Sequence, residues 1–144
     1  MTSPVSILTA NPQGSVWRRW DPHIHAPGTI LADNFRGSNA WEEFLSNIER
    51  SEPVIGALGI TDYLNVDLYE RVAAEKKKGR LPNVGLLFPN IEMRFSIATA
   101  KESGINVHLL VCPEDPNHVE EIRRFLLGLT FTYNGEDYVA SATI

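Results

Sequence analysis

Two histidines separated by one residue are the first feature of this sequence that could do chemistry. His23 and His25 lie in the segment Asp21-Pro22-His23-Ile24-His25. Side chains alternate along an extended chain, so both imidazoles would point to the same side. Such a pair is a natural bidentate ligand for Zn²⁺, Mn²⁺ or Fe²⁺ once a neighbouring carboxylate completes the set. Two surface histidines beside a proline loop would give the same pattern, so the pair alone does not establish a metal site.

Three further side chains occupy similar places in later segments of the chain. Asp62 follows the apolar run 53–61, Glu92 follows the run 84–91, and His108 lies within the run 105–111. In parallel α/β architectures functional residues gather where the strands end, and neighbouring strand ends lie side by side. We therefore expect one cluster of candidate metal ligands, formed by His23, His25, Asp62, Glu92 and His108.

Each member of this set also has a purely structural interpretation. Asp62 could cap the turn or helix that follows it. Glu92 could be an exposed loop acid or an ion-pair partner of Arg94. His108 lies in an apolar strand, where a lone histidine is more often a hydrogen-bonded core residue than a ligand. His118 is left out of the set, because it lies in the first turn of a helix beside acids, where we expect it to be solvated.

The elements that must position these residues alternate between strand and helix, which is typical of an α/β fold. One helix is indicated by Trp41, Phe44, Leu45 and Ile48, whose spacing makes one apolar face. The predicted order is strand 15–24, helix 39–50, strand 53–61, helix 67–78, strand 84–91, strand 105–111, a helix from Asp115, and a hairpin 131–139 turning at Asn134-Gly135. The apolar strands suit parallel pairing, as a small open sheet or as half of a barrel.

Size and composition fit one globular domain of 144 residues with a net charge of −5. An acidic chain lacks the broad basic surface of an autonomous nucleic-acid binder, and its one dense basic run, 76–80, is expected at a solvated helix end. The single cysteine, Cys112, cannot form an internal disulfide and is expected to be buried. A reducing compartment fits best. No stretch approaches the ~18 apolar residues of a membrane span, so we expect a cytoplasmic protein without membrane contact.

Four segments resemble, in order, the motifs of the PHP (polymerase and histidinol phosphatase) family. The segment 21–26, Asp-Pro-His-Ile-His-Ala, resembles the first motif, and 59–63, Gly-Ile-Thr-Asp-Tyr, resembles the second. The segment 88–92, Phe-Pro-Asn-Ile-Glu, resembles the third. His108 matches the strand histidine that comes next in the family. Together the four segments extend over residues 15–112.

The resemblance implies an α/β fold that is the N-terminal half of a distorted (βα)7 PHP barrel, with four mainly parallel strands, flanking helices and a C-terminal hairpin. Residues 1–14 would be an N-terminal arm and residues 15–144 a partial PHP-like domain. Members of the family hydrolyse phosphate esters with divalent metal ions such as Zn, Mn or Fe. By position His23, His25, Glu92 and His108 would be metal ligands and Asp62 a ligand or an orienting residue, with Asp62 and Glu92 as the candidate catalytic residues.

The chain departs from the family pattern at three places. Tyr63 stands where the second motif has a metal-binding histidine. The loop after His25 has Ile30 and Leu31 where the family often supplies an acid or a histidine. The chain also ends at Ile144, before the strands that bring the last ligands, so we expect the rest of the barrel beyond that point or in another chain.

The segments 14–21, 59–63 and 79–92 look like a subgroup in which a PHP-like domain precedes an AAA- or SMC-like ATPase, as in TrlF-type and anti-phage PHP–ATPase proteins. This implies a phosphoesterase or nuclease acting on nucleic acid or nucleotides, with the ATPase in the same chain or in a partner. No Walker motif occurs in these 144 residues, and self-association is left open. The rival hypothesis is a degenerate, non-catalytic PHP scaffold that serves as an interaction or sensor module.

Overall fold

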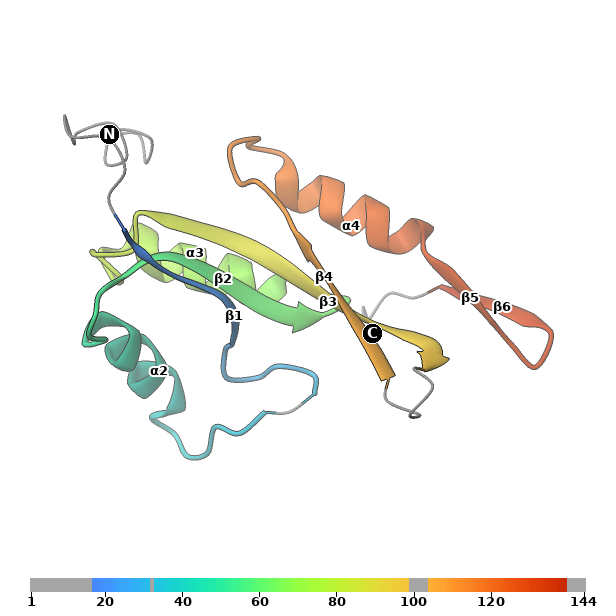
Figure 1. Ribbon diagram of the computed structural model, residues 1–144, viewed down its shortest axis with the longest axis horizontal. Helices are drawn as coiled ribbons and strands as arrows, with labels where there is room; N and C mark the ends of the chain where they lie inside the picture. Colours follow the sequence, from blue (N-terminus) through green and yellow to red (C-terminus); the bar gives the residue numbers. More distant parts are fainter. Residues whose placement is uncertain (1–16, 32, 99–103, 140–144) are drawn as a thin grey trace.

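The computed structural model describes residues 17–31, 33–98 and 104–139 (Figure 1). The expected N-terminal arm, residues 1–14, lies outside this range. The described residues form a four-stranded sheet, three helices and a separate hairpin, which confirms the α/β class. The elements in chain order are β1 (Arg19–His25), α2 (Ala40–Glu49), β2 (Ile55–Tyr63), α3 (Asp67–Lys77), β3 (Leu86–Ala98), β4 (Gly104–Leu110), α4 (His118–Gly128), β5 (Thr130–Tyr133) and β6 (Glu136–Val139).

The main sheet is mixed, with the strand order β1-β2-β3-β4. β1 and β3 both pair with β2 in parallel, as expected, but β4 runs antiparallel to β3. The expectation that the fourth strand suits parallel pairing is therefore wrong. Only residues 99–103 join β3 to β4, whereas a parallel return needs a crossover of a dozen or more residues. The sheet is visibly curled in Figure 1.

The two faces of the sheet have different roles. Leu58 and Ile60 of β2 and Leu87 of β3 belong to the hydrophobic core shared with the helices. Because side chains alternate along a strand, Thr61, Tyr63 and Glu92 fall on the opposite face, and Tyr63 pairs in register with Glu92. One face thus packs against the helices, and the other carries Thr61, Tyr63 and Glu92.

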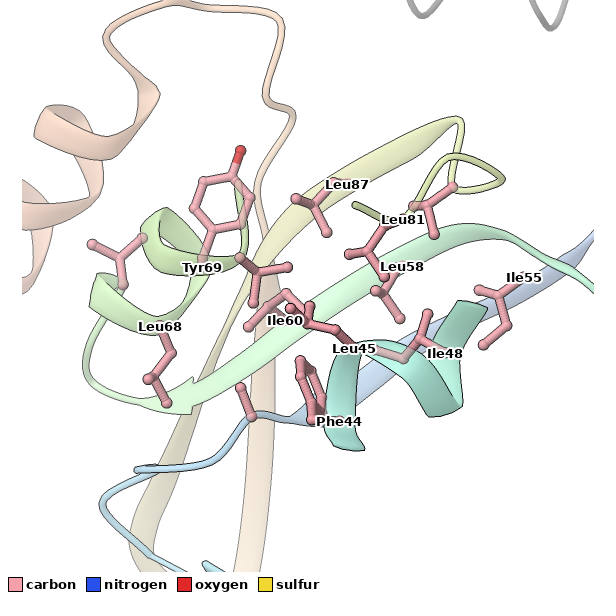
Figure 2. Close-up of a cluster of buried hydrophobic side chains, with 14 of the residues drawn as sticks. Phe44, Leu45, Ile48, Ile55, Leu58, Ile60, Leu68, Tyr69, Leu81 and Leu87 are labelled. Carbon is pink, nitrogen blue, oxygen red and sulfur yellow. The ribbon is translucent and has the colours of Figure 1, made fainter. Parts of the chain in front are cut away.

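The core lies between the helices and the first of these faces (Figure 2). α2 contributes the stripe that the sequence predicts, with Phe44, Leu45 and Ile48 all buried. α3 adds residues such as Val72, and α4 adds Ile122 and Leu126. Burial of each such side chain stabilises the fold by about 1.5–3 kcal/mol. β2 is buried almost throughout, as expected for a strand covered on both faces.

A glycine allows the first two strands to approach closely where β1 is irregular. The pairing of β1 with β2 shifts register between Asp21 and Ile24, on either side of Pro22 and His23. A Cβ atom at Gly59 would lie 2.3 Å from the carbonyl oxygen of Pro22 and 2.8 Å from the Phe88 ring. Only glycine fits there, so Gly59 lets the irregular part of β1, which carries His23, lie against β2. Such bulges often re-aim side chains beside functional sites.

The predicted hairpin is confirmed as β5 and β6, paired antiparallel. Asn134 and Gly135 have φ values of 52° and 81°, the positive pair that a type I′ turn requires. Every residue of β5 and β6 is exposed. In Figure 1 the hairpin extends from the end of α4, away from the main sheet.

Two side chains are not where the sequence interpretation put them. Cys112 is exposed rather than buried, because β4 ends at Leu110 and the cysteine lies in the irregular segment that follows. His118 is not simply solvated: its Nδ1 lies 2.5 Å from the Asp115 carbonyl oxygen and its Nε2 lies 2.9 Å from the Tyr69 hydroxyl. Burial raises the pKa of Tyr69 to about 12, so the phenol stays protonated and its O–H group donates a hydrogen bond to His118. Among the helices described, none combines the length and the apolar character needed to cross a membrane.

Candidate metal centre

Three potential ligand atoms from β1 and β3 form a small triangle on the polar face of the sheet. The Nε2 atoms of His23 and His25 are 3.1 Å apart. The Oε2 atom of Glu92 lies 3.5 Å from the first and 3.4 Å from the second. Four-coordinate Zn²⁺ with ligand distances of about 2.0–2.2 Å would separate its ligands by about 3.3–3.6 Å. The triangle therefore has nearly the size that one small cation would impose.

Glu92 is the most constrained member of this triangle. Its side chain is 2 % exposed, and its Oε2 atom is buried without a hydrogen-bond partner. The other oxygen, Oε1, accepts a hydrogen bond of 2.7 Å from the Asn106 side-chain amide. A buried carboxylate oxygen without a donor costs on the order of 1–3 kcal/mol or more. The Asn106 amide thus binds Oε1, and Oε2 is left free to bind a cation.

A chain of hydrogen bonds fixes the tautomer of His25. The Thr29 hydroxyl donates its only proton to Asp62 Oδ1 at 2.8 Å, so its oxygen must accept from His25 Nδ1 at 3.2 Å. The proton of a neutral His25 is then on Nδ1, and Nε2 keeps a lone pair directed at the triangle. This is how carboxylates orient metal-binding histidines in proteins, here with a hydroxyl between them.

His108 is oriented in the same way from the other side of the cluster. The Asn90 amide nitrogen donates to the Pro22 carbonyl at 2.8 Å, which makes the amide oxygen the group that faces His108 Nδ1 at 3.1 Å. His108 therefore donates from Nδ1 and keeps its Nε2 lone pair. Sheet register supports the arrangement, because Glu92 of β3 pairs directly with His108 of β4.

His23 and Glu92 are shared between two overlapping groups of ligands. One is the triangle with His25; in the other, His23, Glu92 and His108 each place a ligand atom within 4.8 Å of the others. The rings of His23 and His108 are 4.5 Å apart between centroids. His23, His25, Glu92 and His108 thus form one cluster, in which His23 and Glu92 are common to both groups.

The electrostatic environment keeps His25 neutral. Burial lowers the pKa of the His25 imidazole, and the neighbouring His23 lowers it further, while the carboxylates of Glu92 and Asp62 raise it. The net direction is downward, so at neutral pH this imidazole carries no charge. A neutral imidazole is the form that binds metal ions.

Asp62 lies beside the cluster rather than in it. Its Oδ1 atom accepts hydrogen bonds from the Thr29 hydroxyl and from the backbone N–H groups of Ile30 and Tyr63. With these bonds the buried carboxylate anchors the loop after β1. The capping role considered for Asp62 is not observed, because α3 begins after Val66 without a side-chain cap and the Tyr63 N–H group that Asp62 binds lies within β2 itself.

Tyr63 also lies next to the cluster, where its ring stacks on His25 with centroids 5.4 Å apart and planes inclined by 17°. The Tyr63 hydroxyl accepts a hydrogen bond of 3.0 Å from Arg94. Arg94 therefore contacts Tyr63, and the alternative in which it pairs with Glu92 is wrong.

The structure brings together His23, His25, Glu92 and His108, as predicted. The predicted cause, that the ends of parallel strands lie side by side, applies to only part of the set. The two histidines of β1 lie at the end of a strand that pairs in parallel. Glu92 and His108 lie inside β3 and β4, opposite each other in an antiparallel pair. The supporting residues Asn90 and Asn106 were missed, because nothing in sequence marks an asparagine as an orienting residue until the pairing register is known.

Comparison with models of protein families, with curated proteins and with solved structures found no match. The function proposed next is based on the geometry of the cluster and on the resemblance of the four motifs.

Proposed function

We propose that this chain is the N-terminal half of a PHP-like barrel and binds divalent metal ions for the hydrolysis of phosphate esters. The observation that carries the proposal is the buried Glu92 Oε2 atom, which has no hydrogen-bond donor and faces two imidazole nitrogens at 3.4 and 3.5 Å. His23, His25, Glu92 and His108 would hold Zn, Mn or Fe.

A proton on His23 explains the geometry less well than a cation. An N–H group at His23 Nε2 can reach the lone pair of His25 at 3.1 Å, but the Glu92 oxygen is then left at 3.5 Å. A cation would contact all three atoms at once. The mixture of imidazole and carboxylate ligands suits Zn²⁺, Mn²⁺ or Fe²⁺ rather than Ca²⁺, which prefers oxygen ligands only.

The protein residues would act by holding and orienting. Asp62 and Thr29 keep the Nε2 lone pair of His25 directed inward, and Asn90 does the same for His108. Bound cations would supply an acidified water and neutralise charge on the phosphate oxygens. Of the two candidate catalytic residues, Glu92 is proposed as a ligand and Asp62 as a positioning residue.

The resemblance to PHP–ATPase proteins suggests nucleic acid or nucleotides as substrate, and an AAA- or SMC-like ATPase as partner in anti-phage defence. The net charge of −5 fits a substrate bound at a local site better than one bound over a broad surface. A full-length natural protein with His23→Ala should then fail to restrict phage in a plaque assay.

One observation favours the rival hypothesis of a non-catalytic scaffold. Tyr63 stands in place of a histidine, and its hydroxyl is engaged by Arg94. Tyrosine is a poor ligand for these ions, so the cluster would hold fewer of them. A protein that binds metal but does not hydrolyse phosphate esters would fit this second candidate.

The test compares Glu92→Gln with Glu43→Gln in the natural protein that carries this chain. Glutamine keeps the size and removes the charge, and Glu43 is an exposed acid on α2. Titration calorimetry with Mn²⁺ should give at least a tenfold weaker Kd for Glu92→Gln, with no change for Glu43→Gln. Hydrolysis of bis-p-nitrophenyl phosphate and of oligonucleotides should be lost only in the first variant. Wild-type protein that binds no Mn²⁺, Zn²⁺ or Fe²⁺ would contradict the proposal.

A further inference from the structure

Arg94 holds a positive charge at the edge of the candidate metal centre. It lies two residues after Glu92 on β3, so the two side chains leave the same face of the sheet, about 6.6 Å apart along the strand. Glu92 is buried whereas Arg94 is exposed. The strand thus presents first a buried carboxylate and then an accessible guanidinium.

Tyr63 holds this guanidinium in place. The Arg94 Cζ atom lies 4.9 Å from the centre of the Tyr63 ring, and an Arg94 N–H group donates to the Tyr63 hydroxyl at 3.0 Å. The tyrosine is itself buried and stacked on His25. Consecutive contacts therefore link a candidate metal ligand, an aromatic ring and an arginine. A cation–π contact of this kind restricts a side chain that would otherwise move freely.

Within the described ranges, Arg94 has no carboxylate within ion-pair distance. Arg80 and Arg123 are different: the first pairs with Glu42 and Glu49, and the second with acids that include Asp67. A guanidinium has five N–H donors, and the one hydrogen bond to Tyr63 leaves most of them available.

We propose that Arg94 is an anion-binding residue that receives an oxygen of a phosphoryl group whose other oxygens face the metal cluster. This inference rests on the proposed function and adds a site for the ligand to it. The ligand class is a phosphate ester, because a phosphoryl group offers several oxygens to a guanidinium fork and to cations at the same time. Tyr63 then serves to anchor the arginine.

The experiment measures binding of inorganic phosphate and of dimethyl phosphate to the Mn²⁺-loaded natural protein. We expect Arg94→Gln to weaken binding of the preferred anion about tenfold or more, since a charge-assisted hydrogen bond contributes about 1.5–3 kcal/mol. Arg94→Lys keeps the charge without the fork and should recover part of the affinity. The Kd for Mn²⁺ should be the same in all variants. Tighter binding of dimethyl phosphate would identify a diester site, and tighter binding of inorganic phosphate a monoester site.

Arg124→Gln is the matched control, because Arg124 is a surface residue of α4 whose side chain is 75 % exposed. Its phosphate affinity should equal that of the wild type. Equal affinities in wild type and Arg94→Gln, or no binding of either anion, would overturn the inference even if Mn²⁺ binds. A protein that binds no Mn²⁺ contradicts the proposed function instead. In that case the role of Arg94 is tested on the metal-free protein, by comparing the phosphate affinity of wild type and Arg94→Gln at low ionic strength.

Discussion

At the scale of single residues, the cluster is defined by the direction of its hydrogen bonds. The Thr29 hydroxyl and the Asn90 amide each have one partner that can act only as an acceptor: the Asp62 carboxylate and the Pro22 carbonyl. Those partners force both groups to accept from a histidine Nδ1. As a result the Nε2 atoms carry lone pairs and can bind a cation without rearrangement of the side chains.

Thr29→Val tests this directly, because valine has nearly the same shape and no hydroxyl. His25 Nδ1 would lose its acceptor, and the tautomer of His25 would no longer be fixed. We expect about a tenfold loss of Mn²⁺ affinity, the effect typical of removing a group that orients a metal ligand, measured by titration calorimetry. Thr132→Val is the control, since Thr132 also donates to an aspartate, Asp137, but in the hairpin. Equal Mn²⁺ affinity in the two variants would contradict the role given to Thr29.

How far the sequence predicts the cluster depends on the kind of residue. His23 and His25 could be predicted because a spacing of two places both imidazoles on one side of any strand. Glu92 and His108 could be proposed as members, but their direct pairing follows from the antiparallel register of β3 and β4. From the sequence alone, Arg94 is indicated only as a partner for Glu92. Its contact with Tyr63 depends on the neighbouring strand β2, in which Tyr63 lies 31 residues earlier in the chain.

At the scale of elements, one ion-pair network joins α2 to the segment after α3. The Glu49 carboxylate accepts hydrogen bonds from Arg80 Nε and from the backbone N–H of Leu81, both at 2.8 Å. Leu81 is fully buried and has a φ of 54°, which is rare for a leucine. Glu49 thus holds the unusual backbone that brings Leu81 into the core.

Replacing Glu49 with glutamine should destabilise the fold in a pH-dependent way. The hydrogen bonds from Arg80 hold the pKa of Glu49 below its ordinary value. Its ionised form therefore stabilises the fold above the unfolded-state pKa of about 4.3, and this contribution is lost as the pH falls through the lower, folded-state pKa. We expect Glu49→Gln to lower the free energy of unfolding by about 1–2 kcal/mol at pH 7 and by less below pH 4. Urea unfolding at both pH values measures this.

Glu43→Gln is again the control, as an exposed acid of the same helix, and should change stability little at either pH. If Glu49→Gln lowers the free energy of unfolding by the same amount at pH 7 and below pH 4, the charge of the Glu49 carboxylate is not the cause of the loss.

Helix positions could be predicted because apolar periodicity and burial agree: α2 and α3 lie within one residue of the predicted ranges. The direction of β4 could also have been inferred, from the short segment between β3 and β4, had the full length of β3 been known. That strand extends to Ala98, beyond the apolar run that predicts it, because its later residues pair with β4 rather than with a hydrophobic layer.

At the scale of the whole molecule, the hydrophobic core and the candidate metal centre lie on opposite faces of one curled sheet. The helices pack on the face that carries Leu58 and Ile60, and the candidate metal centre lies on the other face. The β5–β6 hairpin contributes to neither, since all of its residues are exposed and none belongs to the hydrophobic core. The structure therefore predicts that the hairpin can be removed separately.

Ending the chain after Leu129 removes the hairpin and should leave both the melting temperature and the Mn²⁺ affinity close to those of the 144-residue chain. Leu126→Ala is the contrasting change, three residues before the cut. Leu126 is buried with Ile122 where α4 meets the core, so a cavity there should cost about 2–4 kcal/mol and lower the melting temperature by about 5–15 °C. Circular dichroism with heating measures both proteins. If the melting temperature of the shortened chain is as low as that of Leu126→Ala, the hairpin stabilises the fold and cannot be removed separately.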